Sequence, residues 1–338
     1  MNEKRYNLKK LCAIVDIGYI VSMVLFSLIA HEQIQNSLIG PYYILVFAGV
    51  FALIVLYGLH LQRCEKAGKE TLGLNFIHTI AKYEFLLEQL VMRDFKIKYK
   101  RSVLGVFWSF LNPLLMMLVQ YVVFSKLFGV RGMSVEHYAI YLLCGIVMFN
   151  GFNDCTSQAM RAITSNSSLI TKVYVPKYIY PVSKVLSSSI NIFLSMVPLL
   201  LVTFVYGLFN GLYLTPAILL LPVALFFLIL FIMGMGFLLS SLMVFFHDVE
   251  FLWGVITTMW MYATPIIYDI KMLEGTWVAK ILVFNPLYHY VDFVREIILY
   301  GRSPEMIEYV VCFAFSFGMF LIGAFVFKKT QDKFVLYI

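Results

Sequence analysis

Long apolar runs recur along the whole chain and are separated by shorter polar segments. A run of about 20 apolar residues is long enough for a helix to cross the ~30 Å hydrocarbon core of a bilayer. Because backbone groups in lipid must be hydrogen-bonded within the protein, such runs predict transmembrane helices. The pattern therefore predicts an all-α polytopic membrane protein. The eight predicted spans are 11–30, 42–61, 103–125, 138–155, 179–208, 214–246, 249–268 and 307–327.

Residues 83–101 are too charged to form a further span. Their apolar residues recur at helical spacing, while acidic and basic residues fall elsewhere on the helical wheel. This pattern is typical of a helix that lies in the membrane interface, with its basic end attracted to anionic lipid. The apolar face of this predicted helix comprises Tyr83, Leu86, Leu87, Leu90 and Val91.

Residues 269–304 form a second exception to the pattern of span and short loop. They are only partly apolar, are interrupted by Gly275, Pro286 and Gly301, and contain two helical patterns too short to cross a membrane. Irregular backbone occurs at membrane depth only where it packs in protein or lines a cavity. We expect a re-entrant segment here, and an ordinary outer loop is the alternative.

Composition supports the membrane assignment and excludes several function classes. Hydrophobic residues make up 61% of the 338 residues and charged residues only 13%, against about 25% charged in soluble domains. A soluble enzyme, a secreted disulfide scaffold and a nucleic-acid-binding domain are therefore excluded. The net charge is +7, and its basic residues indicate the topology. If the N-terminus is cytoplasmic, 20 of the 26 Lys and Arg residues lie on the cytoplasmic side of the predicted membrane spans. Both termini are therefore predicted to be cytoplasmic.

Neither metal nor nucleotide chemistry is indicated on this chain. The five cysteines include no CxxC pair, and no GxxxxGK[ST] loop occurs. We therefore expect no disulfide framework, no metal site and no ATP hydrolysis by this chain alone.

A short helix is predicted between the spans 138–155 and 179–208. Residues suited to a helix N-cap are followed by apolar residues at helical spacing, and Pro176 ends the pattern because it lacks an amide proton. This helix would expose apolar side chains with basic side chains beside them. A surface loop without such a helix is the alternative. The residues are Asn166, Ser167, Ser168, Leu169, Ile170, Lys172 and Pro176.

Two predicted spans carry polar and aromatic residues along one face. Sugars present apolar C–H faces and polar rims, so such stripes are candidate parts of a sugar path. Hydrogen bonding between neighbouring helices is an equally simple explanation. The stripes contain Ser109, Asn112, Gln120 and Phe124 on 103–125, and Trp253, Thr257, Trp260, Thr264 and Tyr268 on 249–268.

Over residues 84–334 the chain resembles the ABC-2 permease subunits of polysaccharide exporters, which move O-antigen, capsule and teichoic acid polymers. Four short motifs occur in the right order on a matching six-span topology. They are Arg93-Asp94-Phe95-Lys96-Ile97-Lys98-Tyr99-Lys100-Arg101-Ser102 with Leu104-Gly105, Trp108 and Asn112-Pro113, then Asn166-Ser167-Ser168-Leu169-Ile170 with Pro176-Lys177, then His247-Asp248-Val249, and Asn285-Pro286-Leu287 with Arg295.

The resemblance implies a permease domain over 76–338, preceded by a two-span hairpin and linker over 1–75. It implies a homodimer in the bacterial cytoplasmic membrane, in contact with membrane lipids, that exports a lipid-linked polysaccharide. The predicted short helix would be the coupling helix to two copies of a separate ATP-binding subunit, which would hold ATP and Mg; no nucleic acid is involved. The motif residues of the interfacial helix are Arg93, Asp94, Lys96, Tyr99 and Arg101.

Two features depart from the family pattern, and other functions stay open. The hairpin is additional to the six-span core, and His247 stands where the family usually has Arg. One alternative is an integral-membrane transferase acting on polyprenyl-linked sugars, which would use the run His247-Asp248-Val249-Glu250. An ABC-2 drug exporter is another. A secondary transporter or channel is disfavoured, because neither internal repeats nor midplane charges are found.

Overall fold

The computed structural model describes residues 8–29, 43–67, 71–100, 102–127, 137–172, 175–211, 214–273 and 275–337. Every regular element in these ranges is helical, so the predicted all-α class is confirmed. The chain divides into two compact units, 1–89 and 90–338, and the division falls inside one helix. The domain boundary predicted at residue 75 stays a prediction.

The first unit is built on a pair of helices, α1 (Leu8–Ile29) and α3 (Tyr43–Lys66), that pack against each other. The Tyr19 and Phe51 rings stack across the pair with centroids 5.8 Å apart. These helices coincide with the predicted spans 11–30 and 42–61 apart from the outermost residues. Whether they cross a membrane stays a prediction.

Helix α4 (Leu72–Tyr99) begins in the first unit and ends in the second. A helix covers 83–99 as predicted, but it starts earlier, at Leu72. Its position in a membrane interface stays a prediction, and Arg101 lies outside the described residues.

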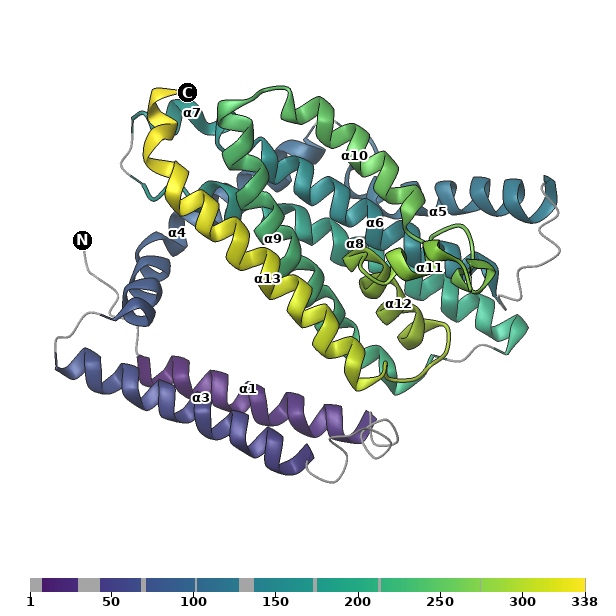
Figure 1. The fold of residues 1–338 in the computed structure, drawn as a ribbon, viewed down its shortest axis with the longest axis horizontal. Coiled ribbons are helices and arrows are strands. Elements are labelled where there is room, and N and C mark those ends of the chain that lie inside the picture. The colour runs from purple at the N-terminus through teal and green to yellow at the C-terminus, as the bar shows by residue number, and fades with distance from the viewer. Residues whose placement is uncertain are drawn as a thin grey trace. The chain divides into compact units, whose positions relative to one another are not determined.

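The second unit is a bundle of long helices with α6 at its centre (Figure 1). Residues Ile140–Phe149 of α6 are buried throughout, because α5, α8 and α9 pack around this helix. The helices of this unit are α5 (Trp108–Tyr121), α6 (Tyr138–Met160), α7 (Ser167–Ile170), α8 (Ile179–Asn210), α9 (Leu221–Phe245), α10 (Val249–Ala263), α11 (Trp277–Leu282), α12 (Pro286–Ile298) and α13 (Met306–Thr330).

Helices α9 and α13 meet backbone to backbone at two glycines. A Cβ atom on Gly234 would collide with the backbone of Met319, and one on Gly323 would collide with the backbone of Gly234. Glycine is therefore required at both positions for the two backbones to pack in direct contact (Figure 1).

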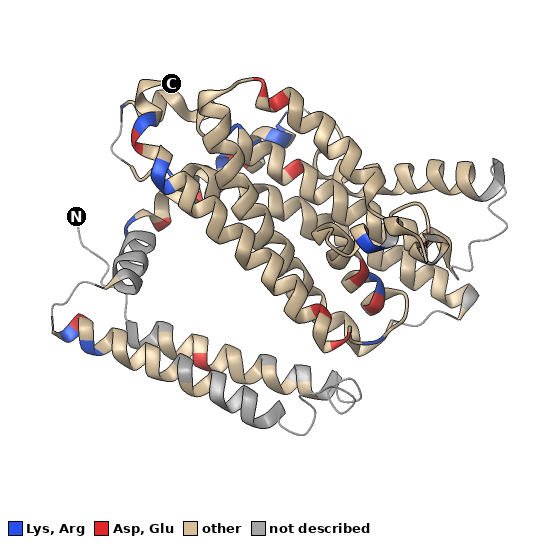
Figure 2. Ribbon diagram, in the orientation of Figure 1, with Lys and Arg blue, Asp and Glu red and all other residues tan. Residues whose placement is uncertain are grey.

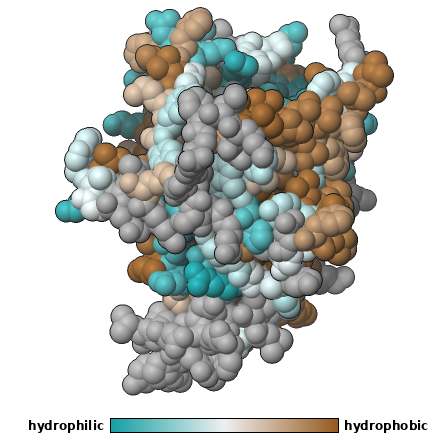
Figure 3. All heavy atoms as spheres, turned by 90° about the vertical axis from the view of Figure 1, so that its right-hand side faces the viewer, coloured by the Kyte–Doolittle hydropathy of each residue, from teal (hydrophilic) through white to brown (hydrophobic). Residues whose placement is uncertain are grey.

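Five helical stretches in the described residues are long and apolar enough to cross a membrane: Gly105–Phe124, Tyr138–Met160, Ile179–Phe209, Pro216–Phe245 and Met306–Leu336. They correspond to five of the eight predicted spans. Figure 2 shows charged residues gathered mainly toward the ends of these helices. Many large apolar side chains are exposed, and Figure 3 shows such side chains covering one broad area of the face it views.

The predicted span 249–268 is wrong in its last five residues, 264–268. Helix α10 ends at Ala263 and has 15 residues, about 22 Å at 1.5 Å per residue. Thr264 is extended, with φ −99° and ψ 130°, because Pro265 disfavours the helical conformation of the residue before it.

The segment 269–304, which is predicted to lie on the outer side, contains two short helices, α11 and α12, as its sequence pattern predicted. Helix α12 packs against α6, α9 and α13. Gly275 and Gly301 adopt positive φ angles of 81° and 65° in the turns that bound these helices. The part of the segment that forms α12 is thus packed in protein, and re-entry of the segment into a membrane stays a prediction.

Candidate functional site: the junction of α4, α8 and the turn before α7

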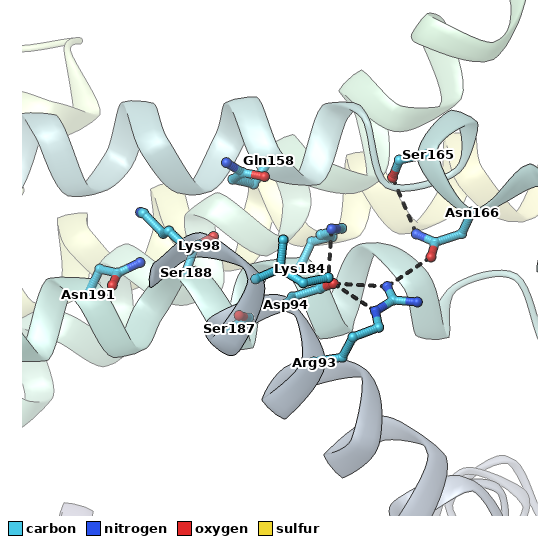
Figure 4. A pocket seen from close by; sticks show the side chains of 11 residues that line it. Arg93, Asp94, Lys98, Gln158, Ser165, Asn166, Lys184, Ser187, Ser188 and Asn191 are labelled. Carbon is cyan, nitrogen blue, oxygen red and sulfur yellow. Dashed lines mark hydrogen bonds and ion pairs between the residues drawn. The ribbon is translucent and has the colours of Figure 1, made fainter. Parts of the chain in front are cut away.

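Arg93 joins two segments that lie far apart in the sequence. Its Nη2 donates to Asn166 Oδ1 at 3.0 Å, although the residues are 73 positions apart. Its Nε and Nη2 also donate to Asp94 Oδ1, at 3.0 and 2.8 Å. The motif residue of α4 is therefore bonded directly to the segment between α6 and α8, residues 161–178, which contains the predicted coupling helix and which we call the coupling segment (Figure 4).

Asn166 occupies the N-cap of α7, but its side chain makes no capping hydrogen bond. Its Nδ2 instead donates to the Ala162 carbonyl at 2.8 Å and to Ser165 Oγ at 3.3 Å. The predicted capping role is thus wrong for this side chain, because both ends of its amide are engaged in holding the turn and in binding Arg93. Asn166 is 3% exposed.

Asp94 receives a second cation from α8. Lys184 Nζ lies 3.0 Å from Asp94 Oδ2, and the two side chains are 16% and 9% exposed. A carboxylate with so little contact with water needs compensation, since breaking a buried ion pair costs about 3–5 kcal/mol. Asp94 is therefore the anion that holds α4 against α8. We call Arg93, Asp94, Asn166 and Lys184 the junction.

The last turns of α4 make further polar contacts. Tyr99 Oη donates to Asn191 Oδ1 on α8 at 2.5 Å and lies 2.6 Å from Ser109 Oγ on α5. Lys98 Nζ lies 2.7 Å from Asp154 Oδ2 on α6. The end of α4 is thereby tied to α5, α6, α8 and the coupling segment, whereas the predicted interfacial residue Lys96 is exposed.

A cavity of about 420 Å³ opens beside the junction. Its walls come from α4, α6, α8 and the turn before α7, as Figure 4 shows. The lining residues are Arg93, Asp94, Ile97, Lys98, Gln158, Ser165, Asn166, Lys184, Ser187, Ser188 and Asn191.

The coupling segment projects an apolar side chain beyond the junction. Helix α7 is only four residues long, Ser167–Ile170, shorter than the sequence pattern suggested. Leu169 is 37% exposed and Ile170 is half-buried, while Ser168 and Lys172 are exposed. Beyond Pro176, Lys177 Nζ donates to the Gln331 carbonyl at 2.6 Å, which holds the segment to the C-terminal part of the chain.

The predicted stripe on α10 faces the interior of the single chain. Trp253 and Thr257 are each 5% exposed, and Thr264 is fully buried. The Trp260 ring packs on Phe152 with centroids 5.3 Å apart, and Trp260 Nε1 donates to Asn285 Oδ1 at 2.8 Å. These contacts favour the packing explanation for these four residues. Tyr268, beyond the end of the helix, is half-buried.

The residues of the stripe on α5 lie in different environments. Ser109 belongs to the Tyr99 contact described above, and Asn112 is exposed. Gln120 Oε1 is buried without a hydrogen-bond partner in the described part of the chain, and Phe124 is half-buried. A role of this stripe in a sugar path stays a prediction.

Sequence reasoning missed two residues that organise this unit, and it gave a third, Arg295, no role beyond its place in a motif. Lys184 and Asn191 are single polar residues at the start of an apolar span, a signal that was present but was not interpreted. Arg295, 2% exposed, places its guanidinium 3.4 Å from the centre of the Tyr141 ring. It donates to the Pro265 carbonyl at 2.8 Å, so it stabilises the irregular backbone beyond α10.

The acidic run after α9 gives little support to a transferase. His247 and Asp248 are exposed. Glu250 Oε1 accepts a hydrogen bond from Arg161 Nη2 at 2.5 Å, which joins the start of α10 to the end of α6.

Comparison with known proteins follows the same regions. Residues 86–299 match the family described as ABC-2 type transporter. The chain belongs to this family. It is 26% identical over 262 residues to the O-antigen export system permease protein RfbA of Myxococcus xanthus, a match covering 77% of this chain and 98% of that protein. It is 28% identical over 252 residues to an RfbA permease of Klebsiella pneumoniae, covering 74% and 93%.

A shorter match involves a capsule protein. The chain is 28% identical over 102 residues to the capsule polysaccharide export inner-membrane protein CtrC of Neisseria meningitidis, covering 30% of this chain and 38% of that protein. The ABC-2 protein described here is thus a membrane-embedded, multi-pass transport permease. Its family match begins within α4, just before the junction, and includes the coupling segment.

Proposed function

We propose that this chain is the transmembrane subunit of an ATP-driven exporter that moves a lipid-linked polysaccharide out across the bacterial cytoplasmic membrane. The observation that carries the proposal is the match to O-antigen permeases over nearly their whole length, 98% in one case. The excess of basic residues at one end of the spans supports cytoplasmic termini.

The chain would do no covalent chemistry, and ATP with Mg would act on a separate ATP-binding subunit. Leu169 supports this because an exposed apolar side chain on a short, well-held turn suits insertion into a partner's cleft. The coupling segment then passes the partner's movement to α4 through Asn166 and Arg93, and to α8 through Asp94 and Lys184.

Two copies of the permease with two ATP-binding subunits form the proposed assembly. The outward face of α10 supports pairing or lipid contact, because Phe251 is 78% exposed and Met259 is 66% exposed in the single chain. Tyr262, on the same face, is 63% exposed.

The function is tested by reconstitution. The chain and the ATP-binding subunit that co-purifies with it from native membranes are placed in vesicles containing the glycolipid extracted from the same cells. We expect polymer to become accessible on the opposite side only with ATP and Mg. An ATP-binding subunit unable to hydrolyse ATP serves as the control. ATP-dependent movement of small hydrophobic drugs, with none of polymer, would contradict the proposal and favour a drug exporter.

A further inference from the structure

More basic than acidic side chains line the cavity beside the junction. Three of its lining residues are cations, Arg93, Lys98 and Lys184, and Asp94 is the single acidic residue among the eleven that line it. Arg93 and Lys184 share the one carboxylate of Asp94, so this pair of cations carries a net positive charge into the cavity. Lys98 is paired with Asp154, which lies outside the lining.

Two serines of α8 supply hydroxyl groups that are not used elsewhere in the described part of the chain. Serines inside helices commonly donate back to their own helix. Ser183 and Ser189 do so, donating to the Tyr180 and Val185 carbonyls at 2.8 and 2.7 Å. Ser187 and Ser188, between them, are each 6% exposed, line the cavity and make no such bond.

Amide groups add to this set of available donors. Asn191 uses its Oδ1 to accept from Tyr99, which directs the donor end of the amide to other partners. Gln158 on α6 lines the opposite wall without a hydrogen bond to the described residues. Donors that face a cavity in this way are expected to bond to water or to a ligand.

We propose that this cavity binds the phosphate group of a membrane lipid. Phosphate oxygens accept hydrogen bonds from guanidinium, ammonium and hydroxyl groups together, and Arg and Lys are the side chains that bind them most strongly. The volume of about 420 Å³ is many times the ~10–15 Å³ that one water molecule needs on the same measure, so the cavity has room for a group larger than water, such as a phosphate.

This inference rests on the proposed function and extends it, because it places a lipid phosphate next to the segment that would contact the ATP-binding subunit. A phosphate held between α4 and α8 would lie next to Arg93, which is bonded to the coupling segment. The lipid is either the anchor of the transported polymer or an anionic phospholipid. Both present the same phosphate chemistry, and the experiment separates them.

Binding is measured with the full chain in phosphatidylcholine nanodiscs, without ATP or a partner subunit. The probes are farnesyl diphosphate, farnesol and inorganic diphosphate. We expect farnesyl diphosphate to bind saturably and farnesol not to bind. Ser187→Ala with Ser188→Ala, which changes no charge, should weaken binding about a hundredfold, because each of the two hydroxyl groups would donate a hydrogen bond to a charged oxygen and each such bond contributes about a factor of ten.

Lys184→Gln should also weaken binding about tenfold, whereas Lys328→Gln, which removes an exposed cation from the end of α13, should leave it unchanged. Adding phosphatidylglycerol to the nanodisc identifies the source. If phosphatidylglycerol competes with farnesyl diphosphate in the wild type, an anionic phospholipid fills the same site. If it does not compete, the site is assigned to the diphosphate anchor of a polymer.

Equal affinity of the wild type and the double serine variant, or equal affinity for farnesol and farnesyl diphosphate, would overturn the proposal. A failure of polymer export in the reconstituted exporter would instead contradict the proposed function. The two failures are distinct because the binding assay contains neither ATP nor polymer.

Discussion

Arg93 and Asn166 are bonded side chain to side chain at 3.0 Å across 73 residues of sequence. The bond links the end of a helix that carries the basic motif to a turn that carries the exposed Leu169. It gives the coupling segment a direct mechanical connection to α4, and through the shared Asp94 carboxylate to Lys184 on α8.

Asn166→Ala is expected to reduce ATP-dependent export severalfold without releasing the ATP-binding subunit. The substitution removes the acceptor of Arg93 and the donor to Ala162, while the exposed Leu169 stays in place. Export in vesicles and co-purification of the partner are measured together. Thr171→Ala is the control, because its hydroxyl bonds only within the coupling segment. Wild-type export by the Asn166 variant would show that the bond transmits nothing.

Leu169→Asp combined with Ile170→Asp should abolish export and release the ATP-binding subunit. Interfaces concentrate their energy in a few buried apolar residues, and a carboxylate in such a pocket is costly. Membrane insertion should be unaffected, since Leu169 is 37% exposed in the chain itself. Leu169→Met serves as the conservative control and should retain the partner. Co-purification at wild-type levels in the double variant would contradict the assignment.

Hydropathy was sufficient to predict the helical class and five of the spans, because lipid leaves a long apolar segment no alternative to a helix. It overestimated the span at 249–268 because the local effect of Pro265 ended the helix early. The run remains apolar to Ile267, so hydropathy alone cannot find this break.

The site was predicted in parts but not as a whole. Arg93, Asp94 and Asn166 were each identified from motifs, whereas their contact depends on long-range packing that sequence spacing does not reveal. The stripe of Trp253, Thr257 and Trp260 was correctly placed on one helix face. Whether that face points to a pore or to neighbouring helices depends on the tertiary arrangement, and in the single chain it packs on Phe152.

Topology can be tested with two exposed lysines. Lys172→Cys lies in the coupling segment and Lys280→Cys in α11 of the outer segment. An impermeant thiol reagent added to intact cells should label the second and not the first, since the basic residues predict that the coupling segment is cytoplasmic. The native Cys64 is a poor reporter because it is only 8% exposed. Labelling of the Lys172 position before lysis would reverse the orientation.

His289 predicts a pH dependence of stability in the outer segment. Burial lowers its pKa, but the hydrogen bond to Glu308 and the contact with the Val283 carbonyl raise it more, so the pKa of His289 is raised overall. Burial also raises the pKa of Asp292 to about 6. In both cases the folded state binds the proton more tightly, so stability falls as pH rises through these pKa values.

Thermal unfolding of the purified chain should therefore occur at a lower temperature at pH 8 than at pH 5. His289→Gln should reduce this difference, because the neutral amide cannot gain the ion pair with Glu308, now at 2.9 Å. A variant with an unchanged pH dependence would show that other groups control it.

The α9–α13 contact gives the sharpest test of packing. Gly323→Ala places a Cβ atom against the backbone of Gly234, which cannot move away as a flexible side chain would. Overpacking of this kind typically costs about 1–3 kcal/mol, and the collision here is with main chain, so we expect the upper end of that range.

Gly318→Ala on the same helix is the matched control, because its Cβ meets nothing within 4 Å. That control should be neutral or slightly stabilising, since alanine is favoured over glycine inside helices. Thermal unfolding in detergent compares the two variants directly. Equal midpoints for both would mean that α9 and α13 separate more easily than their backbone contact requires.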